Sequence, residues 1–122
     1  MTISTKLLGM ASAGVLLTGQ LALAPVASAA GPSMIEEGKK LAFTRKKGNC
    51  LACHMIAGGQ AAGNIAPPLG AMQSRFKSKA ELKAQIADAT VKNPETSMPP
   101  FGRHKILSDA EINKVVEFVW SL

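Results

Sequence analysis

The stretch Cys50-Leu51-Ala52-Cys53-His54 carries the most specific pattern in this chain. Two cysteines separated by two residues and followed at once by a histidine form the attachment motif of a c-type haem. The spacing lets one tight turn present both sulfurs to the vinyl groups on one edge of a porphyrin. The histidine then projects onto the iron from the proximal face. We therefore expect one covalently bound haem c, attached through Cys50 and Cys53, with His54 as an iron ligand.

Other readings of this stretch give different chemistry. A thioredoxin-like redox pair uses the same two cysteines, but it sits in a strand-and-helix unit that the sequence does not predict. A zinc site needs further ligands, and His104 is the only other histidine. A structural disulfide between Cys50 and Cys53 gives His54 no role. Haem attachment uses all three side chains, so it is the leading interpretation.

The first 29 residues differ from the rest of the chain. Lys6 is their only charge, and residues 7–26 are mainly apolar or small. Ala27-Ser28-Ala29 then offers a small-residue cleavage site. This order is typical of a secretory signal peptide, and an uncleaved membrane anchor is the alternative. We expect residues 1–29 to be removed after Ala29 and the protein to be exported to the periplasm, without stable insertion in the membrane.

Residues 30–122 are predicted to form a single small domain. Without Lys6, its 13 basic and 8 acidic residues give a formal charge of +5. No basic run exceeds Arg45-Lys46-Lys47, and export also argues against a nucleic-acid partner. Four phenylalanines, one tryptophan and no tyrosine offer little apolar surface for a core. Small domains usually need additional stabilisation from a disulfide, a metal or a cofactor, and a large apolar cofactor suits this composition.

Three main helices are expected, and each follows a serine that has a glutamate three residues later. Such a capping box satisfies two backbone amides at the helix start. The predicted helices run from Ser33 to about Lys47, from Lys79 to about Thr90, and onward from Ser108. The last one carries an apolar stripe formed by Ile112, Val115, Val116 and Val119. Two long loops rich in proline and glycine, 55–77 and 91–107, separate them, with one short helical turn expected in 70–76.

An electron-transfer haem needs a sixth iron ligand. The candidates are Met34, Met55, Met72, Met98 and His104. Met34 is expected in the core. Met55 directly follows His54 and cannot reach the opposite face of the porphyrin. Met98 precedes two prolines, which stiffen the loop and lower the entropy lost in holding a thioether on iron. We predict Met98 as the ligand, with His104 as its main rival; thioether ligation favours reduced iron.

These features resemble a class I cytochrome c over the whole of residues 30–122. The resemblance implies an all-α fold, with three main helices and two long loops around one covalent haem. It also implies that the first and last helices cross, with Gly38 and Ala42 meeting the stripe of the last helix. In Ala66-Pro67-Pro68-Leu69, Pro67 would accept the ring N–H of the proximal histidine, and Leu69 would pack on the haem. Ala66 stands where the family usually has glycine.

Three longer stretches resemble the SoxX family, the small monohaem subunits of the SoxAX cytochromes of thiosulfate oxidation. They are residues 48–54, residues 63–69, and residues 98–112 with Met98-Pro99-Pro100-Phe101-Gly102-Arg103-His104. The resemblance implies a SoxA-type dihaem or monohaem partner that joins thiosulfate to a cysteine of a SoxYZ-type carrier. This chain would take up the released electrons and pass them to a soluble cytochrome. The alternatives are a free-standing electron shuttle, a sensor with an open iron, and a haem-free thiol oxidoreductase.

Overall fold

The computed structural model describes residues 33–122. The predicted signal peptide, residues 1–29, and its cleavage site lie outside the described residues. Within 33–122, no helix has both the length and the apolar character that crossing a membrane requires.

The described part of the chain is helical. Its only strand-like pairing is an isolated bridge between Ile56 and Leu69. The helices and short 3-10 turns are α1 Met34–Phe43, η1 Cys50–Ala52, α2 Met72–Arg75, α3 Lys79–Ala87, η2 Ala89–Val91 and α4 Asp109–Trp120. The all-α prediction is therefore confirmed, with three main helices, the expected short turn at α2, and two long loops.

Helix α1 begins as predicted and ends earlier than predicted. Ser33 and Glu36 form both hydrogen bonds of the capping box. The helix ends at Phe43 because Thr44 takes an extended conformation with ψ of 119°. The chain then turns back, and the Gly48 N–H donates to the carbonyl of Leu41 at 3.1 Å. This early turn directs the following residues beneath the helix, towards the cysteine motif.

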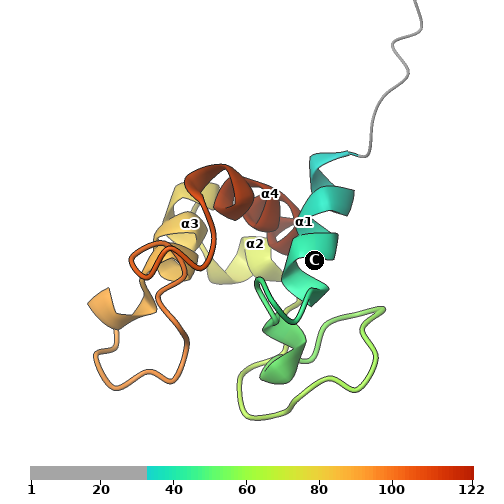
Figure 1. Ribbon diagram of the computed structural model, residues 1–122, viewed down its shortest axis with the longest axis horizontal. Coiled ribbons are helices and arrows are strands. Elements are labelled where there is room, and N and C mark those ends of the chain that lie inside the picture. Colours follow the sequence, from blue (N-terminus) through green and yellow to red (C-terminus); the bar gives the residue numbers. More distant parts are fainter. Residues whose placement is uncertain (1–32) are drawn as a thin grey trace, which may run out of the picture.

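Helices α1 and α4 cross closely, as Figure 1 shows. The predicted crossing is confirmed, but its partners at Gly38 differ from the expected stripe. A Cβ at Gly38 would lie 1.9 Å from the carbonyl oxygen of Lys114 and 2.9 Å from Cβ of Phe118. The Lys114 side chain pairs with Glu37 of α1, so Lys114 contacts α1 through both its backbone and its side chain. Phe118 also meets Phe43 edge to face, with ring centroids 5.7 Å apart.

The core lies mainly under α4. The predicted stripe of α4 is buried in full, at 1–4% exposure for Ile112, Val115, Val116 and Val119. The capping box of Ser108 and Glu111 is complete. Met34, in contrast, was expected in the core and is 51% exposed. It occupies the first position of α1, where the helix extends beyond its crossing with α4 (Figure 1).

The second predicted capping box is only half formed. Ser78 accepts from the Glu81 N–H, but the Glu81 carboxylate accepts instead from the Lys77 N–H and from the Lys92 ammonium. Helix α3 also ends at Ala87, before the predicted Thr90. Asp88 is extended, and its side chain caps the separate turn η2 by accepting from the Thr90 N–H.

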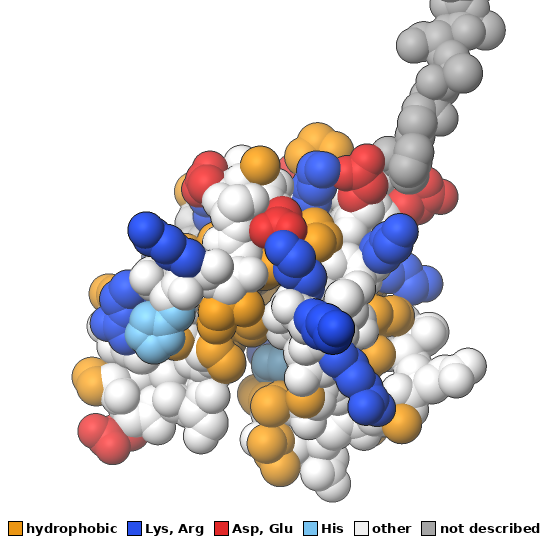
Figure 2. All heavy atoms as spheres, viewed as in Figure 1, with side chains coloured by type: hydrophobic (Ala, Val, Ile, Leu, Met, Phe, Trp, Pro, Cys, Tyr) orange, Lys and Arg blue, Asp and Glu red, His pale blue; other side chains and the backbone are white. Residues whose placement is uncertain are grey.

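The two long loops project to the same side of the helices (Figure 1). One loop carries η1 and residues 53–71, and the other runs from η2 to α4. The space-filling view in Figure 2 shows a hollow between them, edged by apolar side chains. This hollow is the opening of the cleft described next.

Candidate haem-binding cleft

A cleft of about 730 Å³ separates the two loops and reaches the core. Its volume is within the range of pockets that take a cofactor-sized ligand. Its apolar walls include Leu82, Ile86 and Phe101, which the sequence did not single out. All six predicted site residues line it: Cys50, Cys53, His54, Pro67, Leu69 and Met98.

The cysteines lie on one tight turn. Asn49 opens the turn in the left-handed region, with φ of 47°, which asparagine tolerates better than most residues. The N–H groups of Cys53 and His54 both donate to the carbonyl of Cys50, at 3.2 and 2.9 Å. The two sulfurs are not joined in a disulfide. The turn thus holds Cys50, Cys53 and His54 against one cleft, as the spacing predicted.

Gly63 supports this turn from the outside. Its N–H donates to the Leu51 carbonyl at 2.7 Å. A Cβ at this position would lie 2.2 Å from the Ala52 carbonyl oxygen and 3.0 Å from Cα of Cys53. Only glycine lets the loop approach so closely. The sequence gives no sign of this contact, since it depends on a loop that returns to the motif.

The His54 ring is oriented by a backbone carbonyl. Its Nδ1 lies 2.7 Å from the carbonyl oxygen of Pro67. A carbonyl only accepts, so Nδ1 carries the proton and Nε2 keeps its lone pair for a metal. Ala66 has an ordinary negative φ and donates its N–H to Cys53 at 3.0 Å. The alanine in place of glycine therefore leaves this backbone undisturbed.

Met98 lies in the other loop, partly buried against the core. Its N–H donates to the Thr96 hydroxyl at 3.2 Å. His104 is exposed and does not line the cleft. Met55 is 54% exposed, whereas Met72 is 2% exposed and packed among core side chains. Of the predicted candidates, Met98 is the partly accessible thioether on the loop across the cleft from the cysteine motif.

The environment of Cys50 does not favour an activated thiol. Burial raises the pKa of the Cys50 thiol to about 11, and the neighbouring Cys53 adds to the rise, against a smaller opposing effect of a backbone hydrogen bond. A thiol with this pKa is protonated at neutral pH and is a poor nucleophile. Among residues 33–122, no three His, Cys, Asp or Glu side chains are grouped to hold a metal ion. Neither the thioredoxin-like nor the zinc interpretation gains support.

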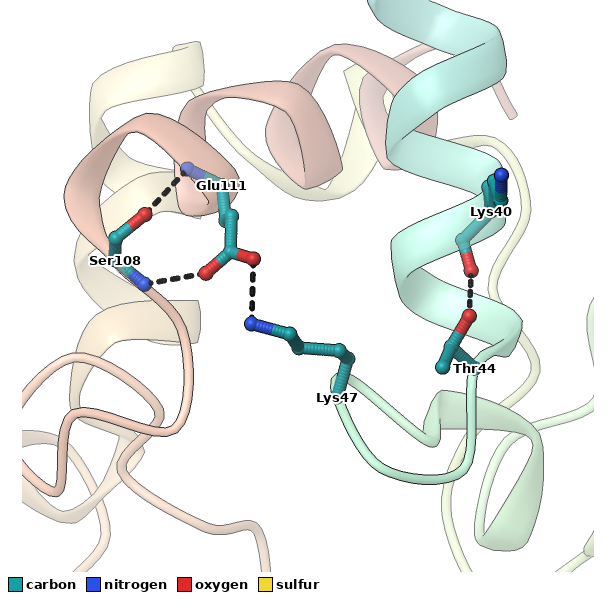
Figure 3. Close-up of polar contacts among 5 residues, drawn as sticks. All are labelled: Lys40, Thr44, Lys47, Ser108 and Glu111. Carbon is teal, nitrogen blue, oxygen red and sulfur yellow. Dashed lines mark hydrogen bonds and ion pairs between the residues drawn. The ribbon is translucent and has the colours of Figure 1, made fainter.

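Of the charged residues that line the cleft, Lys47 is already in an ion pair. The Lys47 ammonium binds the Glu111 carboxylate at 2.7 Å (Figure 3). The same carboxylate also accepts from the Ser108 N–H and so completes the capping box of α4. Arg103 lies 3.4 Å from Asp88. Lys47 and Arg103 are thus paired within the chain, which lowers the positive charge that they contribute to the surface.

The donor set fits a planar apolar group that carries a metal. Two thiols lie on one turn, an imidazole keeps Nε2 free, and a thioether lies on the other loop. The walls between them are mainly apolar. This combination suits a covalently attached porphyrin, whose iron accepts nitrogen and sulfur ligands.

Comparisons with known proteins agree with this chemistry. A family model described as Cytochrome c matches residues 35–122. Among solved structures, the crystal structure of SoxXA from P. pantotrophus is similar, with 30% sequence identity and a TM-score of 0.64. That similarity covers 73% of this chain and 81% of the other chain. A search of curated protein sequences found no match.

The family match spans most of the sequence, so the chain belongs to the cytochrome c family. Family membership and the cysteine pair give the protein one covalently bound haem c, and its function is haem electron transfer. The two comparisons together support a SoxX-type class I cytochrome c.

Proposed function

We propose that this protein is the monohaem electron-transfer subunit of a SoxXA-type complex. Cys50 and Cys53 would hold its haem covalently, and His54 and Met98 would ligate the iron. The observation that carries the proposal is the cleft, which has the cysteine motif and His54 on one loop and Met98 on the other. The similarity to SoxXA supports this assignment over that of an unrelated cytochrome.

The side chains of the cleft have separate tasks. When bound, the haem supplies an iron that changes oxidation state by one electron. Pro67 keeps the Nδ1 proton of His54 in a hydrogen bond, which raises the basicity of Nε2 and fixes the ring orientation. The Met98 thioether would be the second iron ligand and would favour the reduced state. Leu69 and the apolar walls exclude water, so small molecules have poor access to the iron.

The substrate chemistry belongs to a partner in this proposal. The chain has two cysteines, and both are used in haem attachment, so no thiol remains for sulfur transfer. A SoxA-type subunit would couple thiosulfate oxidatively to a cysteine of a SoxYZ-type carrier. This chain would accept the released electrons and pass them to a soluble cytochrome.

We also propose export to the periplasm, with cleavage after Ala29. The charge, apolar and small-residue order of residues 1–29 supports this. Covalent haem attachment at a Cys-x-x-Cys-His motif and the similarity to SoxXA agree with it.

Affinity purification of the tagged holoprotein from its native host tests the subunit assignment. We expect a second, larger c-type cytochrome to co-purify in stoichiometric amount, visible as a second haem-stained band. A tagged variant with Cys50 and Cys53 replaced by serine controls for capture by the tag alone. Recovery of a lone haem-loaded monomer under gentle conditions would favour the free electron shuttle. Binding of carbon monoxide by the untreated reduced protein would instead indicate an open iron.

A further inference from the structure

The turn that orients His54 has few means of being held. Pro67 and Pro68 are consecutive prolines and lack N–H groups, so at these two positions the backbone can only accept hydrogen bonds, through the carbonyl oxygens. The Pro67 carbonyl accepts from His54 Nδ1 at 2.7 Å. The carbonyl of Pro68 is the other acceptor at these two positions.

Arg75 is the donor to this second carbonyl. Its Nη1 donates to the Pro68 carbonyl at 2.7 Å and lies 3.6 Å from the Met72 sulfur. Arg75 lines the cleft, and none of the ion pairs within residues 33–122 includes it. Its guanidinium is thus directed at a neutral backbone group, although a carboxylate would be the stronger partner.

The backbone of the short helix that carries Arg75 is hydrogen-bonded to the helical core. Arg75 is the last residue of α2. The Ala71 N–H, just before that helix, donates to the Leu122 carbonyl at 3.0 Å. The Gln73 side-chain amide donates to the Trp120 carbonyl at 3.2 Å, and Met72 is 2% exposed. The short helix is therefore anchored to the C-terminal end of α4.

The other hydrogen bonds of the turn lead only to the cysteine-motif loop. Ala66 donates to Cys53 at 3.0 Å, and Leu69 donates to Met55 at 2.9 Å. Both acceptors adjoin His54 in sequence, so these bonds move with it. Only the Arg75 contact connects residues 66–69 by a hydrogen bond to α2, and so to the helical core, in the described part of the chain.

We infer that Arg75 is a positioning residue for the axial histidine: by holding the Pro68 carbonyl it fixes the Pro67 carbonyl and, through it, the His54 ring. The inference rests on the proposed ligation of iron by His54. It assigns to Arg75 a role in the orientation of the ring, separate from the effect of its positive charge on the haem.

The test compares R75Q and R75K with K77Q in the haem-loaded protein. Lys77 is exposed, makes none of the ion pairs, and does not line the cleft, so K77Q removes a nearby charge without touching the turn. Proton NMR measures the exchange rate of the His54 Nδ1 proton and the haem-methyl shifts, which report the orientation of the axial ring. The reduction potential is measured on the same samples.

We expect the His54 Nδ1 proton to exchange about tenfold faster in R75Q, with altered haem-methyl shifts, because a charge-assisted hydrogen bond is lost. R75K should fall between R75Q and the wild type, and K77Q should match the wild type. Amide protection in α1 serves as the internal reference for intact folding.

Equal exchange rates and shifts in R75Q, K77Q and the wild type would overturn the inference. A change in potential of the same size in R75Q and K77Q, without faster exchange, would also overturn it, because charge alone would explain Arg75. A wild-type spectrum without a histidine-ligated haem would instead refute the proposed function itself.

Discussion

The crossed helices α1 and α4 and the two loops of the cleft are held by different interactions. The helices begin at complete capping boxes and meet through backbone contact at Gly38 and an edge-to-face aromatic pair. The cysteine-motif loop, residues 48–71, is held mainly by backbone hydrogen bonds to itself, and the Met98 loop, residues 88–107, likewise. Within residues 33–122, no hydrogen bond or ion pair joins one loop to the other.

This difference shows what the cofactor contributes to the structure. The helical core can pack around its own side chains, whereas the two loops face each other across a cleft of about 730 Å³. A group that binds His54 on one side and Met98 on the other would connect the loops. The haem is then a structural crosslink as well as the redox centre, as expected for a domain this small.

The largest effect is expected from replacing both Cys50 and Cys53 with serine. Covalent haem should be lost completely, as measured by haem staining of the denatured protein. The two loops should lose amide protection against hydrogen exchange, while α1 and α4 retain more of theirs. Protected loops without haem would contradict the structural role given to the cofactor.

Gly38→Ala should disrupt the helical core rather than the cleft. The new methyl group would overlap the Lys114 carbonyl, so we expect the free energy of unfolding to fall by about 3 kcal/mol. Denaturant titration of the holoprotein measures the change. Gly70→Ala is the matched control, because a Cβ there meets nothing within 4 Å. An effect of equal size at both glycines would argue against the close helix crossing.

Met98→Ala should act on the cleft rather than the helices. We expect the weak thioether-to-iron band at the red end of the oxidised spectrum to vanish and the reduction potential to fall. The free energy of unfolding should fall by about 2 kcal/mol, with faster hydrogen exchange in residues 92–107 than in α1. Met55→Ala, at a methionine that is 54% exposed, is the control. Retention of the band would refute the ligand assignment.

The smallest effect is expected at the Lys47–Glu111 pair, which links the residue just before the cysteine-motif loop to α4. The Lys47 ammonium, and then the Ser108 N–H, hold the pKa of Glu111 below its ordinary value of 4.5. Its stabilisation is therefore present above about pH 4.5 and is lost as the pH falls through the lowered pKa. Glu111→Gln keeps the capping geometry and removes the charge.

Thermal unfolding is measured at about pH 6 and about pH 3.5, which lie on either side of the ordinary pKa of a glutamate. Between these two pH values, we expect the stability of Glu111→Gln to fall by less than that of the wild type. Glu95→Gln is the control, since Glu95 is exposed and makes none of the ion pairs. The same pH dependence in both variants would show that the pair contributes nothing measurable.

Sequence reasoning succeeded where the signals are local. A capping box depends on residues within four consecutive positions, and the boxes at Ser33 and Ser108 form as predicted. The box at Ser78 is incomplete because the Glu81 carboxylate accepts instead from the Lys77 N–H and from the Lys92 ammonium, and Lys92 is distant in sequence. The early end of α1 and the exposure of Met34 also depend on where other elements lie. These features have no marker in the nearby residues.

The sequence by itself determined the chemistry of the site. Two thiols and an imidazole lie within five residues, and this short covalent spacing fixes their relative positions, so few kinds of site can use all three. The sequence also indicated Met98 through the two prolines that follow it, and Pro67 through resemblance to a family. Only the tertiary structure decided that Gly63 supports the cysteine turn and that Arg75 reaches the Pro68 carbonyl. Such contacts join segments through folding, and their partners are chosen by the three-dimensional path of the chain.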